Sequence, residues 1–182
     1  MIVNHTIRYK WHEGYVRNPR DIHQIVLHGT GGGSSAAGLI KWMEDGERSE
    51  SYLKAIGLFH YLIDFDGQVI EIIDPEKWVY HSSSGRHDKE TLGIELMNSE
   101  SKNTGDYNLG QYKALVDLFD ILYDKYTVSS IIGHGACKMI YSGSYKECPG
   151  NFEWEILTDE MISRGYTFTY SEEKINGIKK ES

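Results

Sequence analysis

The stretch QIVLHGTGGGSSAAG, residues 24–38, indicates the type of fold that this chain adopts. It begins with a short run of apolar and β-branched residues, which predicts a buried strand that ends near His28. A glycine-rich turn follows, and then Ser34 or Ser35 can cap a helix that Gly46 can end. A phosphate-binding P-loop is also rich in glycine, but it needs a lysine, which this stretch lacks. The stretch therefore predicts a strand, a turn and a helix, with His28 at the end of the strand.

Strand and helix signals alternate along the rest of the chain. The segment FHYLIDFDGQVIEIID, residues 59–74, has two alternating apolar arms around Asp66 and Gly67, which predicts a β-hairpin. Asn108 precedes apolar residues at helical spacing, which predicts a capped helix. Further strands are predicted at residues 91–98 and 129–134, and a further helix at residues 151–166. This order predicts an α/β protein of one domain, with a central mixed β-sheet flanked by helices.

The composition limits the classes of partner. A chain of 182 residues fits one domain, which we expect over residues 1–166, with an irregular lead-in over residues 1–20 and a loosely held polar C-terminal tail over residues 167–182. The net charge of −8 disfavours nucleic acid as a partner. Neither a membrane span nor an apolar signal-peptide run is visible. We expect a monomer that is cytoplasmic as synthesised and does not insert into membranes.

Three residues have the types and positions expected of metal ligands. His28 and His134 each end an apolar strand and are followed by glycine, which places both imidazoles at an edge of the sheet. Cys148 lies in the turn-like segment YKECPG. Two His and one Cys, with a fourth position left to water, are typical of a catalytic zinc site. The alternative is two ordinary strand-end histidines and a buried free cysteine.

Two further residues are candidates for catalysis. Glu95 lies in the apolar strand LGIELMN, where a carboxylate is costly unless it is paired or used. Its alternative is an edge-strand glutamate that faces water. Lys146 precedes Cys148 by two residues, so an extended turn would place both side chains on one side. Without a metal site nearby, Lys146 would be an ordinary surface lysine.

Cys137 is a competing metal ligand, because HGAC places it three residues after His134. Ligands so close in sequence are typical of closed structural sites, and Pro149 suits a rigid turn that presents Cys148. We therefore favour Cys148. A disulfide between the two cysteines is a further alternative, and it would exclude Cys148 as a ligand.

The chain resembles the zinc-dependent N-acetylmuramoyl-L-alanine amidases of the amidase 2 type, which include phage lysozymes, muropeptide-recycling amidases and peptidoglycan recognition proteins. The matching pieces occur in the order of the family: IVLHGT, FHYLIDFDGQV, VYHSS, LGIELMN, IIGHG and KECPG. Together they span residues 22–153. The resemblance implies the fold described above, one zinc ion per chain, and peptidoglycan or a muropeptide as substrate.

The resemblance also implies a role for each matching residue. The zinc ligands would be His28, His134 and Cys148. Lys146 would act on the oxyanion and Glu95 would be the acid–base group. His81, together with His60 of the hairpin, would contact the substrate.

Two features depart from the pattern of the family. Some members have a catalytic tyrosine immediately before the histidine of the hairpin, and this chain has Phe59 there. Glu95 would therefore carry the proton transfers. In addition, residues 135–145 make the segment between His134 and Cys148 longer than the family pattern leads us to expect.

The leading functional hypothesis is hydrolysis of the amide bond between N-acetylmuramic acid and L-alanine. One alternative is a peptidoglycan-binding module on the same fold without activity, and another is a zinc amidase that acts on a different amide. A phage endolysin, a recycling enzyme and an exported toxin all fit the chain. We favour the endolysin, which would act on the cell wall after release.

Overall fold

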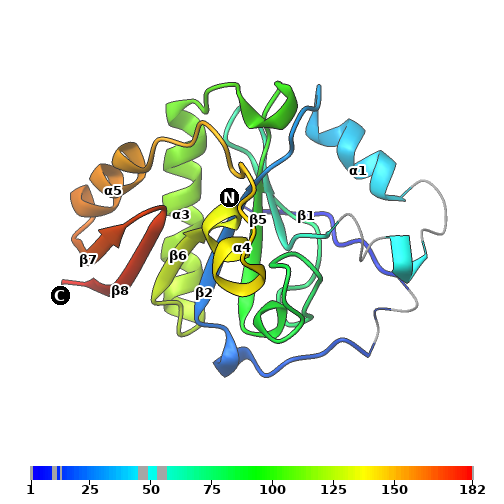
Figure 1. Ribbon diagram of the computed structural model, residues 1–182, viewed down its shortest axis with the longest axis horizontal. Helices are drawn as coiled ribbons and strands as arrows, with labels where there is room; N and C mark the ends of the chain where they lie inside the picture. Colours follow the sequence, from blue (N-terminus) through cyan, green and yellow to red (C-terminus); the bar gives the residue numbers. More distant parts are fainter. Residues whose placement is uncertain (1, 10–11, 13, 45–48, 53–56, 182) are drawn as a thin grey trace.

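The computed structural model describes residues 2–9, 12, 14–44, 49–52 and 57–181. Its strands are β1 (Ile2–Asn4), β2 (Gln24–Gly29), β3 (Tyr61–Ile63), β4 (Val69–Glu71), β5 (Thr91–Leu96), β6 (Ser130–Gly133), β7 (Tyr166–Ser171) and β8 (Lys174–Lys180). They form one eight-stranded sheet in the order β1-β4-β3-β5-β2-β6-β8-β7 (Figure 1). Parallel and antiparallel pairs both occur in it, so the prediction of a mixed sheet is confirmed.

Helices lie on both faces of this sheet. They include the α-helices α1 (Ala36–Glu44), α3 (Leu109–Lys125), α4 (His134–Ser142) and α5 (Trp154–Ser163), and the short 3-10 turns η2 (Pro19–Asp21), η3 (His87–Lys89) and η4 (Ser101–Asn103). The α/β class is thereby confirmed. Within the described residues, no helix is both long enough and apolar enough to span a membrane.

Different helices cover the two faces. Ile25 and Leu27 of β2 belong to the main core with α3 and α5, whereas Val26 packs with Cys137 of α4. Side chains alternate along a strand, so His28 lies on the same face as Val26. Figure 1 shows α4 in front of the sheet and α3 behind it. The side chain of His28 therefore lies on the face that α4 covers.

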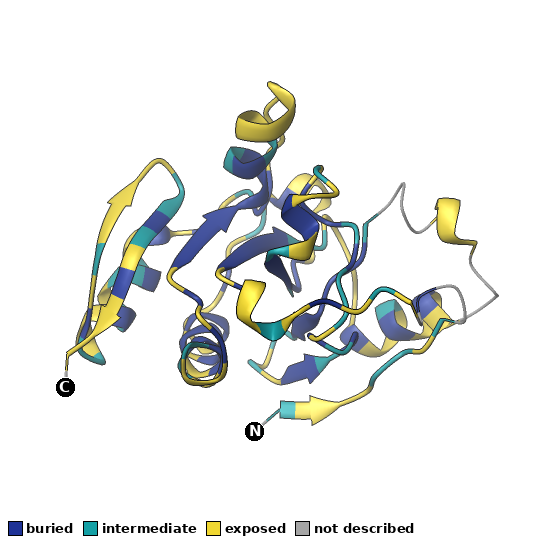
Figure 2. Ribbon diagram, turned by 90° about the horizontal axis from the view of Figure 1, so that it is seen from below, coloured by how far each residue is buried: buried dark blue, intermediate teal, exposed yellow. Residues whose placement is uncertain are grey.

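The helix α1 covers a neighbouring part of that same face. Leu62 of β3 pairs with Glu95 of β5, and it packs in a second apolar cluster with Ile40 and Met43 of α1. Figure 2 shows that buried residues are concentrated in the central strands of the sheet, while the outward surfaces of the helices are exposed. Glu95 thus shares its face of the sheet with α1 and α4, and its neighbours Ile94 and Leu96 point into the main core on the other face, as the alternation predicted.

The hairpin and the longest helix agree with the sequence prediction. β3 and β4 are antiparallel, and Gly67 adopts a positive φ of 80° in the turn between them. A residue with a side chain is strained in that conformation, so glycine suits the turn. At the start of α3, the Asn108 side chain accepts a hydrogen bond from the Gln111 N–H, and the Gln111 side chain accepts one from the Asn108 N–H. This capping box fixes where the helix begins.

The prediction of a loosely held C-terminal tail over residues 167–182 is wrong for residues 167–180. Residues 166–180 form β7 and β8, which extend the sheet beyond β6. The reason is that Tyr166, Ile175 and Ile178 are buried in the main core, although most of their neighbours are polar. These apolar anchors, together with the half-buried Phe168, hold a hairpin in which most other residues are polar.

Three smaller predictions differ from the structure or lie outside it. The lead-in is irregular only in part, because Ile2–Asn4 form β1 and pair in parallel with β4. Residues 135–145, treated as an insertion, contain most of α4, which begins at His134 itself. Gly46, the predicted end of the first helix, lies outside the described residues.

Candidate metal centre

The two histidines of the centre come from adjacent strands of the sheet. His28 is the penultimate residue of β2, and His134 is the first residue of α4, directly after β6. β2 and β6 are parallel neighbours, so both residues lie at the same edge of the sheet. The Cα atoms of His28 and Glu95 are partners in the parallel pairing of β2 and β5, which places Glu95 at that edge as well.

Cys148 reaches the same edge from the loop before α5. The Gly135 N–H donates a hydrogen bond to the Cys148 carbonyl oxygen over 2.7 Å, which ties this loop to the first turn of α4. A Cβ atom on Gly135 would lie 2.1 Å from the carbonyl oxygen of Lys146, so only glycine allows the loop to pass this close. The close approach therefore holds Cys148 against the start of α4.

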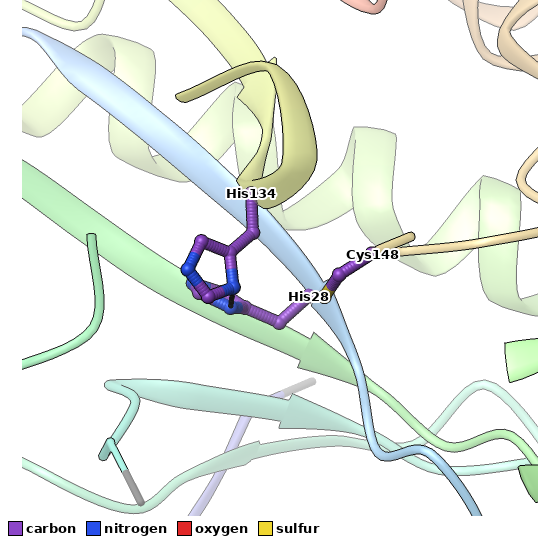
Figure 3. A group of neighbouring side chains, drawn as sticks. All are labelled: His28, His134 and Cys148. Carbon is purple, nitrogen blue, oxygen red and sulfur yellow. Dashed lines mark hydrogen bonds between the residues drawn. The ribbon is translucent and has the colours of Figure 1, made fainter. Parts of the chain in front are cut away.

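The three side chains converge on one point. Figure 3 shows them directed toward one another from β2, from the start of α4 and from the loop. One donor atom from each of His28, His134 and Cys148 lies within 4.8 Å of the others. The Nδ1 atoms of His28 and His134 are 3.1 Å apart. Two nitrogen ligands of tetrahedral zinc, each about 2.0–2.1 Å from the metal, are roughly 3.3 Å apart, so the arrangement has the right size.

The chemistry of these donors also fits zinc. Burial lowers the pKa of His28 well below its usual value and that of His134 to about 4, so both imidazoles are neutral and offer a lone pair. Burial raises the pKa of the Cys148 thiol to about 12, so the thiol loses its proton near neutral pH only when a cation takes its place. Two imidazole nitrogens and one sulfur are a donor set that suits zinc and leaves a fourth position open.

A cavity of about 730 Å³ opens beside these donors. Its polar lining contains the three candidate ligands and the following residues: His81, Ser83, Ser84, Asp88, Glu95, Lys138 and Lys146. Its apolar lining includes Leu39, Trp42, Leu58, Phe59 and Tyr80. The structure thus brings six predicted site residues to one cavity, because His81, Glu95 and Lys146 join the three ligands there.

Glu95 has the electrostatic environment of an acid–base group. Burial raises the pKa of Glu95 to about 7, and the positive charge of Lys146 opposes this rise. A carboxyl group with a pKa near neutral pH can both accept and return a proton there. Phe59, at the position where the resemblance would allow a catalytic tyrosine, also lines the cavity, and its ring has no proton to transfer.

His60 does not reach the cavity, which disagrees with its predicted contact with substrate. Its side chain is fully buried, and its ring nitrogens contact main-chain groups and the guanidinium of Arg17, whose Nη2 atom lies 2.9 Å from Nε2. The Gly93 N–H donates to Nδ1 over 2.9 Å, and Nε2 lies 2.9 Å from the carbonyl oxygen of Lys77, to which it donates. His60 therefore joins the hairpin to β5 below the site. His81 lies between His60 and His28, and it does line the cavity.

Cys137 is not part of the centre. Its Sγ atom points away from the cavity, toward the Ser82 carbonyl oxygen and the Nδ1 atom of His87, each at 3.4 Å. Both cysteines are free thiols, so the alternative of a disulfide is wrong for this structure. Of the two cysteines, the structure places Cys148 with the histidines.

The sequence interpretation missed Lys138 and Ser83. Lys138 lies one helical turn after His134 on α4 and lines the cavity, which is a relation that appears only when the helix is known to begin at His134. Ser83 lies 3.3 Å from the Nε2 atom of His134, through its Oγ atom. Its φ of 66° is unusual for serine, and a single sequence gives no sign of it.

The chain is similar to known proteins in sequence and in fold. Residues 18–151 match the family model described as N-acetylmuramoyl-L-alanine amidase. Comparison with curated protein sequences gave no match.

Solved structures share the fold at low identity. The N-acetylmuramoyl-L-alanine amidase LysC from Clostridium intestinale URNW is 19% identical, with a TM-score of 0.64 over 89% of this chain and 97% of that chain. An AmpD derivative is 20% identical, with a TM-score of 0.62 over 85% of this chain and 92% of that one. The Ph2119 endolysin from the Thermus scotoductus MAT2119 bacteriophage Ph2119 is 22% identical, with a TM-score of 0.59 over 88% and 98%.

Proposed function

Given that the chain belongs to the N-acetylmuramoyl-L-alanine amidase family, we propose that it is a zinc-dependent hydrolase of the amide bond between N-acetylmuramic acid and L-alanine in peptidoglycan. The observation that supports this most is the meeting of His28, His134 and Cys148 with Glu95 in one cavity. We propose one zinc ion per chain, held by those two histidines and the cysteine. A zinc ion there would lower the pKa of a water molecule toward about 7 and polarise the scissile carbonyl group.

Glu95 and Lys146 supply the remaining chemistry. Glu95 accepts a proton from the attacking water and returns it to the leaving amine, and its pKa of about 7 suits both steps. Lys146 lines the cavity on the side of Cys148, and its ammonium group stabilises the negative charge that develops on the carbonyl oxygen. Trp42 and Leu58 belong to the apolar lining of the same cavity, and they would limit the access of water to a bound substrate.

Two features of the site bear on what the substrate is. The cavity of about 730 Å³ is lined by residues of β2, β5 and α4, and this volume leaves room for a substrate larger than a single amino acid. Endolysins occur among the proteins of similar fold, which supports a wall polymer as substrate and action after release to the wall. We propose that the protein is an endolysin of this type and acts as a monomer, with residues 1–166 and the β7–β8 hairpin as one catalytic unit.

The test is hydrolysis of purified peptidoglycan sacculi by the zinc-loaded chain. Release of stem peptides that carry a new amino group on L-alanine, and abolition of this release by a chelator, are the expected results. Binding to sacculi without release would favour the inactive binding module instead. Release of peptides with a different new terminus would favour an amidase of another specificity. Faster cleavage of soluble muropeptides than of sacculi would favour a recycling enzyme.

A further inference from the structure

We propose that residues 80–91 orient both histidine ligands, with His81 holding His28 and Ser83 holding His134, although the segment supplies no ligand itself. This inference rests on the zinc site of the proposed function. The segment runs from the apolar wall of the cavity to the start of β5 and includes η3. Its side chains approach the Nε2 atom of each histidine, which is the ring atom on the side away from the other ligand.

A chain of hydrogen bonds determines which ring nitrogen of His28 carries the proton and which one offers a lone pair. The Thr91 hydroxyl donates its single proton to the His87 carbonyl oxygen over 2.9 Å. Thr91 must therefore accept, and not donate, at the 3.0 Å contact between its Oγ1 atom and Nε2 of His81. The proton of neutral His81 is consequently on Nε2, and its Nδ1 atom is an acceptor.

That acceptor faces His28. Nδ1 of His81 lies 3.3 Å from Nε2 of His28, so the proton of neutral His28 is on Nε2 and is donated to His81. Nδ1 of His28 then carries a lone pair, and it is this atom that lies 3.1 Å from Nδ1 of His134. The tautomer of His28 needed at the metal centre is thus set by Thr91, which is fully buried and does not line the cavity.

Ser83 holds His134 in the matching orientation. Its Oγ atom is 3.3 Å from Nε2 of His134 and can accept the proton of that nitrogen, which leaves Nδ1 for the metal. Two Nδ1 lone pairs that face each other at 3.1 Å repel unless a cation lies against both, as in a zinc site. The segment therefore pre-arranges the two imidazoles for a cation.

The segment is itself firmly held. One carboxylate oxygen of Asp88 accepts hydrogen bonds from the main-chain N–H groups of His81 and Ser82, over 3.0 and 2.7 Å, and from the Ser82 hydroxyl over 2.7 Å. These bonds enclose the tight turn in which Ser83 adopts its φ of 66°. On the other side, a Cβ atom on Gly93 would lie 3.0 Å from Nδ1 of His81, so the absence of a side chain there lets the imidazole lie against β5.

The test measures zinc affinity by competition with a chelator, on the full chain. Thr91→Val removes the hydroxyl and keeps the shape of the side chain, Thr91→Ser keeps the hydroxyl, and Ser83→Ala removes the acceptor for His134. Loss of such partners of metal ligands typically weakens metal binding about 10–100-fold, so Thr91→Val and Ser83→Ala should weaken zinc binding by that order and Thr91→Ser should not. The control is Thr127→Val, since the Thr127 hydroxyl also donates to main-chain oxygens, of Arg20 and Ile22, but at the far end of β2.

Histidine ¹⁵N spectra of the zinc-loaded parent protein test the tautomers directly and do not depend on whether a variant folds. Protons on Nε2 of both His28 and His81 are expected. A proton on Nδ1 of His81 would overturn the inference, as would unchanged zinc affinity in both Thr91→Val and Ser83→Ala. The proposed function fails separately, if the parent binds zinc with the expected tautomers but releases no stem peptide from sacculi.

Discussion

His28 and Glu95 are direct neighbours across the parallel strands β2 and β5. Paired residues of adjacent strands point to the same face, so the candidate ligand and the candidate acid–base group start from one rigid platform. Both also lie near the carboxyl ends of their strands, where the chain turns away from the sheet and leaves room for a substrate. The separation of His28 and Glu95 is therefore determined by the backbone of the sheet, and not by a loop.

Replacement of Glu95 by glutamine should remove the proton transfers and retain the metal. We expect a loss of turnover of roughly 10²–10⁴-fold, as is typical for a general acid–base group, with unchanged zinc content. Turnover on a soluble muropeptide and metal analysis together provide the measurement. Glu155→Gln is the matched control, because Glu155 is exposed on α5, on the other face of the sheet. If Glu95→Gln kept nearly the turnover of the parent protein, Glu95 would not be the acid–base group.

The pH profile should report the same carboxyl group. Burial raises the pKa of Glu95 to about 7, so the group becomes protonated as the pH falls through that value. A protonated Glu95 cannot accept a proton from water, and kcat/KM should therefore decrease about tenfold for each pH unit below 7. An ordinary exposed glutamate would place this decrease near pH 4–5. A profile that stays flat down to pH 5 would show that the rate does not depend on a buried carboxylate.

The two cysteines should differ sharply in their importance for the metal. Cys148→Ser should weaken zinc binding and remove most activity, because it replaces the sulfur that lies within 4.8 Å of both histidine donors. Cys148→Asp should recover part of both properties, since a carboxylate oxygen binds zinc at a similar distance. Cys137→Ser is the matched control, because the Cys137 thiol points toward Ser82 and His87 instead. Equal loss of zinc in both serine variants would contradict the assignment.

The sequence predicted the individual strands and helices well, but it did not predict which strands lie beside each other in the sheet. The strands that lead to His28 and His134 could be read from apolar runs, and the hairpin and α3 from their turn and cap residues. The pairing of His28 with Glu95 could not, because it depends on β5 lying beside β2, and the sequence between them contains the whole β3–β4 hairpin. Strand order is a property of the packed sheet and leaves no mark on any single strand.

His60 and Ser83 show the same limit within the site. The family resemblance placed His60 with the substrate, but its contacts with Gly93 and Lys77 hold it below the cavity. Ser83 reaches His134 only because its backbone adopts a conformation that few serines adopt. In both cases tertiary contacts determine the direction in which the side chain points. A sequence motif gives the residue type, but it does not give these contacts.

The C-terminal hairpin should contribute to stability, in contrast to the loosely held tail that its polar composition predicted. Ile175 of β8 is fully buried, pairs with Ile131 of β6 and packs in the main core with α3 and α5. Ile175→Ala leaves a cavity there, and we expect the free energy of unfolding to fall by about 2–5 kcal/mol. Urea denaturation of the full chain measures this change. Lys179→Ala, at an exposed position of the same strand, should change stability little. If Ile175→Ala were as mild as Lys179→Ala, the hairpin would be dispensable to the fold, and the core of this protein would end at β6.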